Sequence, residues 1–592
     1  MSLLEVSGLT VTTGRSPLVA GLELTIEPGE RVGLIGESGS GKSLTCLSIL
    51  GLLPSNLQAS GSLRLDGVQH DLLRAGEQTW SSLRGKRMSM IFQEPMTALN
   101  PLMKVGKQVT ESMTVHGRPT AEARRRTLEL LGQVGLPDPA VAAQAYPHQL
   151  SGGQRQRVML SMAMANSPDL LLADEPTTAL DVTVQAQVLD LMRQQVRDHN
   201  TALLFITHDL AVVSGMCERV LIMRNGEVLE TGTIDRVFSA PEHSYTRGLL
   251  AASALSTDPH TGKLITVPQG PADPLPPGYS PTSRTSSSTP HQVELVRGAP
   301  ASAGTTGSGN SSPHQMLDDD PDLVFNSTPD PVISVRKLSR TYLRGRTSLF
   351  GPRREVHGLQ PISFDVAAGD RLGIVGESGS GKSTLLRLLC GLDSASSGSA
   401  RVAGLELAGA RERDLRPLRD QVQIVFQDPH SSLDPRMRVR EVISEPLRKV
   451  SEEFRRRKVA ELLHAVGLPS DAASRFPHQF SGGQRQRIAI ARALITEPRI
   501  LLADEAVSAL DVSVRAQVLN LLADLVDSYQ LTLVFVSHDL NVIRHLCRTV
   551  AVMQSGQIVE CGPTQQVYAD AQHPYTRQLI SALPQLDQEA AR

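Results

Sequence analysis

The sequence predicts an α/β fold that occurs twice in one chain of 592 residues. The octapeptide GESGSGKS is found at 36–43 and again at 376–383. Three later motifs, SGGQRQR, LLADE and HDL, follow each copy in the same order, so the repeat covers two long halves. Short, nearly continuous apolar runs lead into GESGSGKS, LLADE and HDL, which is typical of strands buried on both faces of a parallel sheet. Together these observations predict two tandem phosphate-binding (P-loop) cassettes, each with a mainly parallel-sheet core.

The two cassettes are predicted at 1–256 and 332–592, on either side of a segment at 257–331. This segment holds 13 of the chain's 37 prolines and has runs rich in serine and glycine. Such a composition buries too little apolar surface to offset the entropy of the chain, so we predict a largely flexible linker.

Composition argues against several classes of protein. The chain carries 59 basic and 61 acidic residues, without the excess of positive charge that a protein coating nucleic acid needs, so we expect no nucleic-acid partner. No run reaches the ~18 apolar residues of a membrane-spanning helix, and the N-terminus does not resemble a signal peptide, so we expect a cytoplasmic protein. The five cysteines form no CxxC pair, and we interpret them as apolar core residues rather than metal ligands or nucleophiles.

The run RVGLIG at 31–36 is predicted as a buried strand, and GESGSGKS follows it directly. The pattern GxxxxGK followed by Ser or Thr, between a strand and a helix, is typical of a loop that binds nucleotide phosphates. Glycines let backbone N–H groups point at phosphate oxygens, the lysine reaches the β and γ phosphates, and the serine hydroxyl binds Mg²⁺. The residues expected to bind the nucleotide here are Gly36, Ser38, Gly39, Ser40, Gly41, Lys42, Ser43 and Leu44, and Gly376, Ser378, Gly379, Ser380, Gly381, Lys382, Ser383 and Thr384.

An amphipathic helix is predicted at 119–136, with Leu128, Leu131 and Val134 on its apolar side. Three arginines at 124–126 lie away from that side, and the second half has three more at 455–457. We interpret these arginines as a solvated helix face, with a nucleic-acid contact as the alternative.

The SGGQ motif opens the following helix in each half. A serine hydroxyl and backbone N–H groups at a helix start bind anions, so this is a second phosphate-type site. A head-to-tail pair of cassettes would place the SGGQ of one half over the GESGSGKS of the other, with a nucleotide between them. The residues concerned are Ser151, Gly152, Gly153 and Gln154, and Ser481, Gly482, Gly483 and Gln484.

Two further buried strands in each half end in polar residues, and the carboxyl ends of parallel strands meet at one edge of a sheet. The aspartate can hold Mg²⁺, and the glutamate after it can orient or deprotonate the attacking water. An acidic cap on the next turn is the alternative. The histidine can contact the γ-phosphate, with a purely structural histidine as the alternative. These residues are Asp174, Glu175 and His208, and Asp504, Glu505 and His538.

These motifs, with the glutamines in FQEP and FQDP and with TALD and SALD, resemble in their order the nucleotide-binding cassettes of ABC ATPases. The resemblance covers both halves. It implies ATP and Mg²⁺ as cofactors, and an antiparallel β part and a helical subdomain beside each parallel sheet. It also implies that Gln93 and Gln427 bind at the Mg²⁺ site, act in catalysis and couple that site to transport subunits, and that the two glutamates are catalytic bases. Asp181 and Asp511 would lie on a loop that crosses between cassettes.

Other segments resemble one branch of this family. EPMTALNP, DPHSSLDP and the tails PEHSYTRGLL at 241–250 and QHPYTRQLISALP at 572–584 are similar to the two ATPase subunits of oligopeptide, dipeptide and nickel permeases, here fused in one chain. This implies a bacterial importer, attached peripherally to the cytoplasmic face of the cell membrane. Its partners would be two membrane-spanning permease subunits and an extracytoplasmic solute-binding protein, and the two cassettes would pair with each other. Peptides are the favoured cargo, while nickel, opines and glycosides remain open.

The two halves also differ from each other and from relatives. Tyr342 fits the aromatic residue that stacks on adenine in many relatives, whereas the first half has Thr13 there, which implies weaker nucleotide binding at the first loop. Some relatives hold an iron–sulfur cluster after the first cassette, but this chain has Tyr279 near that place and no cysteine before Cys390, so we predict no cluster. Both halves keep the lysine, glutamate and histidine, so both are expected to hydrolyse ATP.

Three other functions compete with an importer. Soluble tandem ABC proteins act on ribosomes, but they usually join their cassettes by a long, charged, helical linker, whereas this linker is rich in Pro, Ser and Gly. The ATPase of an exporter is disfavoured only weakly by the cassettes themselves. A regulatory or scaffold ATPase is disfavoured because both sites look chemically complete.

Overall fold

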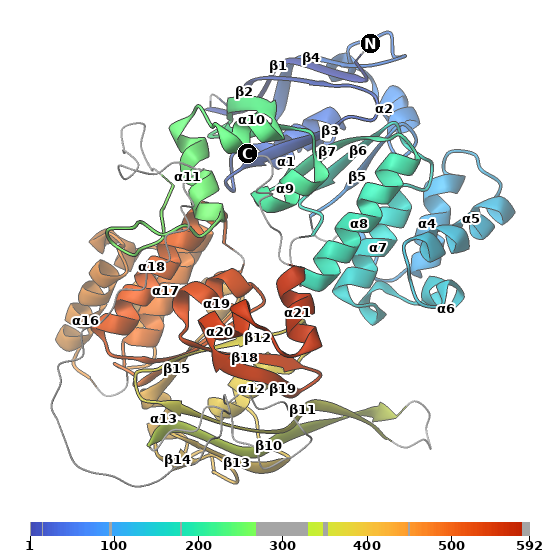
Figure 1. Ribbon diagram of the computed structural model, residues 1–592. Coiled ribbons are helices and arrows are strands. Elements are labelled where there is room, and N and C mark those ends of the chain that lie inside the picture. The colour runs from blue at the N-terminus through green and yellow to red at the C-terminus, as the bar shows by residue number, and fades with distance from the viewer. Residues whose placement is uncertain are drawn as a thin grey trace, which may run out of the picture.

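The computed structural model describes residues 2–14, 16–93, 98–177, 180, 182–267, 330–346, 353–447, 450–508 and 510–582. The first half, coloured blue to green in Figure 1, and the second, coloured yellow to red, are two separate cassettes of the same design. Each has a six-stranded, mainly parallel sheet and a smaller antiparallel sheet. The predicted α/β fold with two tandem cassettes is therefore confirmed.

The main sheet of the first cassette has the order β5-β6-β7-β3-β8-β9, in which only β9 is antiparallel to its neighbour. Its middle strands are apolar along their length because both faces are covered: every residue of β6 and β7 is buried. An antiparallel sheet of order β2-β1-β4 lies beside it. The strands are β1 (Leu4–Thr13), β2 (Ser16–Ile26), β3 (Arg31–Gly36), β4 (Gln58–Leu65), β5 (Met88–Ile91), β6 (Leu170–Asp174), β7 (Ala202–Thr207), β8 (Arg219–Arg224) and β9 (Glu227–Thr233).

The second cassette repeats this topology, with a main sheet of order β15-β16-β17-β12-β18-β19 and an antiparallel sheet of order β11-β10-β13-β14. Because equivalent strands occupy equivalent places, the motifs that follow them also meet at equivalent places. The strands are β10 (Pro331–Arg346), β11 (Arg353–Ala367), β12 (Arg371–Val375), β13 (Ser397–Val402), β14 (Leu405–Glu406), β15 (Val422–Val425), β16 (Ile500–Asp504), β17 (Thr532–Ser537), β18 (Thr549–Gln554) and β19 (Gln557–Pro563).

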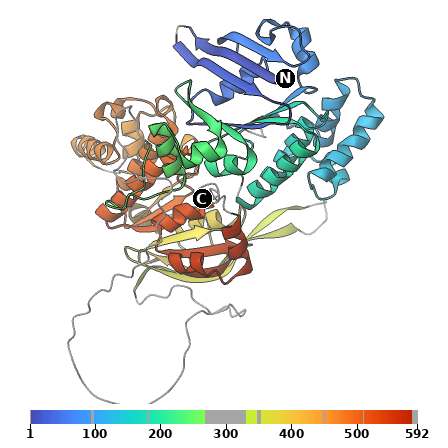
Figure 2. The same cartoon turned by 45° about the horizontal axis from the view of Figure 1, so that its top comes forward.

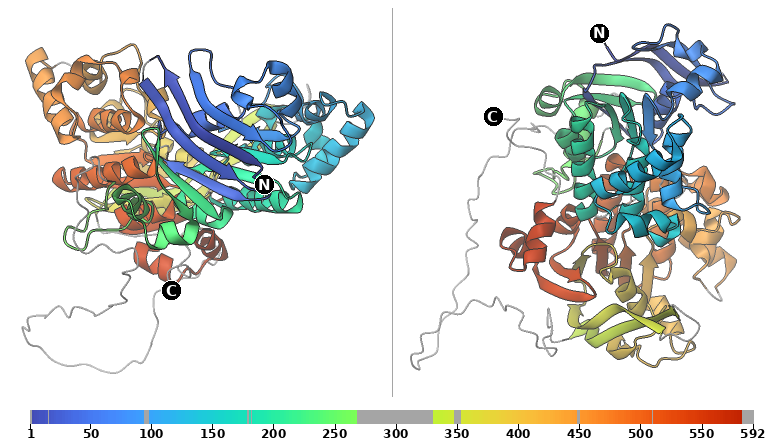
Figure 3. Two further views of the ribbon diagram at one scale, coloured as in Figure 1. Left: turned by 90° about the horizontal axis from the view of Figure 1, so that it is seen from above. Right: turned by 90° about the vertical axis from the view of Figure 1, so that its right-hand side faces the viewer.

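A helical subdomain extends from each main sheet, formed by α4 to α6 in the first cassette and around α15 and α16 in the second. In Figures 1 and 2 these subdomains project to opposite sides of the molecule, and the view from above in Figure 3 shows the same. Opposite projection is the arrangement expected of a head-to-tail pair. The helices of the first cassette are α1 (Lys42–Ile49), α2 (Glu77–Leu83), α4 (Val105–Thr114), α5 (Thr120–Gln133), α6 (Pro139–Gln144), α7 (Gly152–Ala163), α8 (Val182–Asp198), α9 (Leu210–Met216), α10 (Ile234–Ser239) and α11 (Ser244–Ser253).

The helices of the second cassette follow the same order, and the last, α21, is the counterpart of α11. They are α12 (Lys382–Leu389), α13 (Arg416–Gln421), α14 (Pro429–Ser432), α15 (Val439–Ser444), α16 (Glu452–Ala465), α17 (Gly482–Leu494), α18 (Val512–Ser528), α19 (Leu540–Leu546), α20 (Thr564–Ala569) and α21 (Pro574–Ser581). Within the described ranges, no helix has the length and apolar character needed to cross a membrane.

The amphipathic helix predicted at 119–136 is α5, but its buried side differs in part from the prediction. Leu131 is buried as expected, whereas Leu128 is 43% exposed. The buried side instead passes through Ala123, Thr127 and Leu130, because the neighbouring helices α4 and α7 cover that face. Arginines at 125 and 126 form ion pairs with Glu129, which supports the interpretation of a solvated helix face.

The first cassette ends in a segment that packs on the second. Residues 257–267, which fall within the predicted linker, follow α11 and form a bridge between Thr257 and Leu264. The Leu264 backbone N–H donates to the Asn520 side-chain oxygen at 2.9 Å, and the Asn520 amide donates to the Leu264 carbonyl at 2.8 Å. Lys263 forms an ion pair with Asp524 at 2.7 Å. Helix α11 also packs beside α18. We call residues 257–267 the clasp. The rest of the predicted linker, 268–329, lies outside the described residues, and so does Tyr279.

All five cysteines are free thiols, four of them buried and Cys561 partly buried, which confirms the interpretation of core residues.

Candidate functional site

The first GESGSGKS loop joins β3 to α1. Gly41 has a φ of 102° and precedes the helix; a Cβ there would lie 2.8 Å from Val19 and 2.9 Å from the Leu18 carbonyl, so only glycine fits. Lys42 follows it at the start of α1, with Ser43 and Leu44 on the same turn. The Lys42 ammonium donates to the carbonyls of Gly36 and Glu37, both at 2.8 Å.

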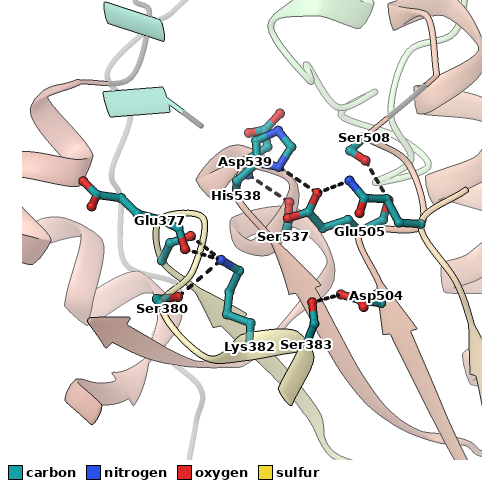
Figure 4. Close-up of polar contacts among 12 residues, drawn as sticks. Glu377, Ser380, Lys382, Ser383, Asp504, Glu505, Ser508, Ser537, His538 and Asp539 are labelled. Carbon is teal, nitrogen blue, oxygen red and sulfur yellow. Dashed lines mark hydrogen bonds and ion pairs between the residues drawn. The ribbon is translucent and has the colours of Figure 1, made fainter. Parts of the chain in front are cut away.

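The second loop, between β12 and α12, has the same geometry. Lys382 donates to the Gly376 carbonyl at 2.6 Å, the Glu377 carbonyl at 2.7 Å and the Ser380 hydroxyl at 3.3 Å. Figure 4 shows the lysine folded back over the loop in this way. Each lysine is therefore held at the loop by neutral acceptors that a phosphate could replace.

Charged groups of both cassettes act on the first lysine. Burial lowers the pKa of Lys42, and the carboxylates of Glu175, Asp511 and Asp174 act in the opposite direction. Asp511 belongs to the second cassette and is the N-cap of α18. A charge of the second half therefore acts on the lysine of the first loop. The role of Asp511 on a cross-cassette loop stays a prediction, and Asp181, its counterpart, lies outside the described residues.

Each main sheet carries an aspartate at the carboxyl end of a central strand, next to the loop serine. The Ser383 hydroxyl donates to Asp504 at 3.3 Å (Figure 4). Burial raises the pKa of Asp174 and of Asp504, and the hydroxyls of Ser43 and Ser383 act against this rise. One buried oxygen of Asp174 has no hydrogen-bond partner in the described structure.

A buried carboxylate with an unpaired oxygen beside a hydroxyl suits Mg²⁺, which prefers oxygen ligands. Within the described ranges, no group of three or more His, Cys, Asp or Glu side chains is placed to hold a metal ion. One carboxylate and one hydroxyl at each site fit an ion that takes further ligands from water and from nucleotide phosphates.

The glutamate after each aspartate is held between a glutamine and a histidine. Glu505 accepts a hydrogen bond from the Gln427 amide at 2.8 Å and lies 3.2 Å from His538 Nδ1. Equivalent distances in the first cassette are 3.0 Å from Gln93 to Glu175 and 3.3 Å from His208 to Glu175. The sequence-predicted residues of three separate strands thus meet at the same sheet edge in both halves.

The backbone of both glutamates fixes this arrangement. Glu175 has a φ of 46° and Glu505 a φ of 48°, values that non-glycine residues rarely adopt. Their N–H groups donate to the carbonyls of Ile206 and Val536 on the neighbouring strands, at 2.9 and 3.0 Å. Strained backbone held by its surroundings in this way is common at active sites.

The electrostatics of the second glutamate keep it ionised. Burial by itself would raise the pKa of Glu505, but the hydrogen bond and charge of His538 and the charge of Lys382 outweigh it, so the pKa lies below its ordinary value. A carboxylate near an attacking water would therefore be available as a proton acceptor at neutral pH.

The SGGQ motif forms a reciprocal cap at the start of α7. The Ser151 hydroxyl accepts from the Gln154 N–H at 3.3 Å, and the Gln154 side chain accepts from the Ser151 N–H at 2.9 Å. Ser481 and Gln484 repeat this at α17. At Gly153 a Cβ would lie 2.3 Å from Val184, so this glycine lets α7 pack against α8. The role of the motif in binding the opposite nucleotide stays a prediction.

Tyr342 lies on β10 with its ring already in contact on one side. Its hydroxyl donates to Asp393 at 2.7 Å, and the Arg340 guanidinium lies 4.7 Å from the ring centre. Arg340 also pairs with Asp393 at 2.7 Å, so the ring orientation is fixed. Thr13 ends β1 in the first cassette and offers no ring. Adenine stacking on Tyr342 stays a prediction.

Two contacts of the structure, those of the tyrosines at the cassette ends and that of Asn520, have no counterpart among the predicted site residues. The tyrosines in HSYTR and HPYTR, Tyr245 and Tyr575, reach the GESGSGKS loops, and their repetition at the same offset as the SGGQ motif is a signal that was available in the sequence. The second contact is that of Asn520, which binds the clasp. Its counterpart in α8 is Asp190, whose carboxylate cannot donate a hydrogen bond to a carbonyl as the Asn520 amide does. That contact could not be predicted, since it depends on how the cassettes pack.

Comparison with known proteins agrees with these features. A family model described as "ABC transporter" matches residues 19–178 and 359–508, and one described as "Oligopeptide/dipeptide transporter, C-terminal region" matches residues 229–277 and 559–592. An oligopeptide transport ATP-binding protein, OppD, of Mycobacterium bovis is 41% identical over 99% of both chains. A glutathione import ATP-binding protein, GsiA, of Pectobacterium atrosepticum is 41% identical over 97% of this chain and 87% of its own. A peptidoglycan transport ATP-binding protein, YejF, of Agrobacterium fabrum is 43% identical over 94% of this chain and 91% of its own.

Proposed function

This chain belongs to the ABC transporter ATPases, and from that premise we propose that it is the motor subunit of a bacterial importer for peptide-containing solutes. It binds and hydrolyses ATP, as members of the family do. The proposal adds that both cassettes are active, that they close on each other around two nucleotides, and that Mg²⁺ serves both sites. It further places the chain at the cytoplasmic face of the membrane, bound to two permease subunits that receive cargo from an extracytoplasmic solute-binding protein.

The observation that carries the proposal is the presence of two complete catalytic groups in one chain. Both halves hold a glutamate bonded to a glutamine and next to a histidine, at similar distances. A cassette that only assists or regulates the other would not need its own glutamate, glutamine and histidine in this arrangement. Pairing is supported by the opposite projection of the helical subdomains and by the Asp511 charge at the first loop.

The chemistry follows from the residues at each sheet edge. On ATP binding, Lys42 and Lys382 exchange the loop carbonyls for phosphate oxygens. Asp174 with Ser43, and Asp504 with Ser383, would hold Mg²⁺, which neutralises phosphate charge when bound. Glu175 and Glu505 accept the proton of the attacking water, while the neighbouring glutamine and histidine fix the direction of each carboxylate.

Closure would couple this chemistry to transport. If the SGGQ donors reach the nucleotide only in the closed pair, ATP binds that state more tightly and shifts the population toward it. To shift the ratio of closed to open pairs from 1:99 to 99:1, ATP must bind the closed state more tightly by about 5.5 kcal/mol, and two nucleotides can share this free energy. Loss of the γ-phosphate removes the contacts, so the cassettes reopen and the permease resets.

The helical subdomain of the first cassette has a hollow suited to a permease helix. The hollow has a volume of about 330 Å³, and Asn100, Met103, Gln108 and Val115 are among its lining residues. Leu102, close by in the chain, is 87% exposed. Exposed apolar side chains around a hollow are typical of a protein interface. The lining residues Ala98 and Asn100 follow soon after Gln93 in the chain, and the Gln93 amide contacts the catalytic glutamate.

The direction of transport and the cargo class rest on the relatives. Both tails match the C-terminal region of oligopeptide and dipeptide transporters, and the three relatives are named for oligopeptide, glutathione and peptidoglycan transport. This favours import of peptide-containing solutes over an exporter or a ribosome-acting protein. Nickel or another cargo remains an alternative within the same branch.

A pull-down of the tagged chain from its native membranes in mild detergent tests the proposal, with mass spectrometry of the partners. We expect two multi-spanning subunits and a solute-binding protein, whose cargo can then be screened. Recovery of ribosomal components from the soluble fraction, without any membrane partner, would overturn the transport function.

A further inference from the structure

The helix at the end of each cassette carries a tyrosine that lies against the GESGSGKS loop of the same cassette. In the second cassette, Tyr575 lies in the first turn of α21 and is 5% exposed. Its hydroxyl accepts a hydrogen bond of 3.0 Å from the backbone N–H of Glu377. Glu377 is the second residue of the loop, so α21 contacts the segment that surrounds the phosphates.

This hydrogen bond and the loop lysine hold the same residue from two sides. The Glu377 carbonyl accepts from the Lys382 ammonium at 2.7 Å, and the Glu377 N–H donates to Tyr575. When the lysine leaves the carbonyl to reach a phosphate, the contact with Tyr575 remains. The tyrosine is thus placed to keep the loop in its binding shape at that moment.

The tyrosine is itself held rigidly. The His573 ring nitrogen accepts from the Tyr575 N–H at 3.2 Å, and the Glu560 carboxylate on β19 accepts from the N–H groups of Gln572 and His573 at 2.9 and 3.1 Å. The start of α21 is therefore tied to the edge of the main sheet, and the position of the phenol is set by the core of the cassette.

The first cassette has the same construction around Tyr245. His243 accepts from the Tyr245 N–H at 3.0 Å, and Glu230 accepts from the N–H groups of Glu242 and His243 at 2.8 and 3.1 Å. Tyr245 is 1% exposed. Its hydroxyl makes no hydrogen bond within the described residues, although the loop residue Glu37 acts on it.

Charged groups of both cassettes act on the Tyr245 hydroxyl. Burial raises its pKa, and the groups that act on the hydroxyl are the Glu37 carboxylate, the Arg224 guanidinium, the Glu37 N–H and the Asp511 carboxylate. Glu37 is the counterpart of Glu377, and Asp511 comes from the second cassette. A buried hydroxyl costs free energy unless it bonds, and phenylalanine would fill the same space. At position 575 the bond from the loop N–H therefore explains why the residue is tyrosine.

We propose that Tyr575 is a positioning residue for ATP binding and hydrolysis, which holds the second residue of the GESGSGKS loop through the phenol oxygen. This contact makes the C-terminal region of the second cassette a structural part of its nucleotide site, and Tyr245 occupies the equivalent position in the first cassette. This inference rests on the proposed assignment of an ATP site to each loop, and it adds a residue outside the family's catalytic motifs.

The test uses the full chain with Lys42→Ala, which confines tight ATP binding to the second loop. Tyr575→Phe is compared with Thr576→Val, a matched control, because Thr576 is next on the same helix, is fully buried and has a hydroxyl without a partner in the described structure. Binding of N-methylanthraniloyl-ATP with Mg²⁺, amide exchange at Glu377 and the melting temperature are measured for each variant.

We expect Tyr575→Phe to weaken nucleotide binding about threefold to tenfold, as for the loss of a hydrogen bond to a buried N–H, and to accelerate exchange at Glu377. Thr576→Val should change neither. Unchanged affinity and exchange in Tyr575→Phe, or an equal loss in Thr576→Val, would overturn the positioning role. If the Lys42→Ala chain itself binds no nucleotide, the ATP site assigned to the second loop is wrong, and the inference fails with it.

Discussion

Replacing both catalytic glutamates by glutamine is expected to stop ATP hydrolysis and leave ATP binding intact. Glu505 lies 2.8 Å from the Gln427 amide and Glu175 lies 3.0 Å from Gln93. Glutamine keeps the shape and an oxygen that still accepts these bonds, but it cannot take a proton from water. A positioned general base contributes about 10²–10⁴-fold, which corresponds to about 2.7–5.4 kcal/mol of barrier height.

The assay is release of phosphate by the single variants and by the double variant, with nucleotide binding measured in parallel. If the two sites act independently, each single variant keeps about half of the turnover, and the double variant falls by the full factor. Glu497→Gln is a matched control, because Glu497 also has a positive φ but pairs with Lys458 on the surface. Turnover of the double variant above about a tenth of the wild-type rate would refute the role of the glutamates.

Three further predictions concern the clasp, the nucleotide base and the thiols. Asn520→Asp removes the donor to the Leu264 carbonyl, and after proteolytic cleavage between the cassettes it should weaken their association by about 1 kcal/mol in a dilution assay; equal association would contradict the clasp. Tyr342→Ala should weaken ATP binding by about 0.5–1.5 kcal/mol, whereas Tyr342→Phe, which loses only the bond to Asp393, should keep the affinity. Because burial raises the pKa of Cys390 and Cys561 to about 12 and raises that of the other three cysteines as well, thiolate forms only at high pH. A disulfide reagent at pH near 8 should therefore react slowly with the native chain and rapidly with five thiols after unfolding; fast native reaction would show that the thiols are accessible.

The parts of this protein that could be predicted from sequence are those where chemistry demands a fixed spacing. A phosphate loop needs its glycines, lysine and serine in order, so Lys42 and Lys382 could be assigned from eight residues each. Buried parallel strands consist of apolar runs that stop at a functional edge, so the order of the strands and motifs is enough to predict that Glu175 and His208 meet.

The remaining features depend on tertiary packing. Leu128 follows the helical pattern but is exposed, because the neighbouring helices cover the side of α5 that contains Ala123 and Leu130. Residues 257–263 have the polar, proline-containing composition of a linker, yet backbone groups of Leu264 bind Asn520 in the other cassette. The bond from Glu377 to Tyr575 joins residues 198 positions apart, beyond any local pattern.

The measurement that tests the account most directly is uptake of a labelled short peptide into the interior of native membrane vesicles that carry the permease, with this chain and ATP supplied on the cytoplasmic face. The account predicts uptake that requires ATP and the wild-type chain and is absent with the Glu175→Gln, Glu505→Gln variant. Equal uptake with that variant, or ATP-driven movement of the peptide in the opposite direction, would contradict the importer motor.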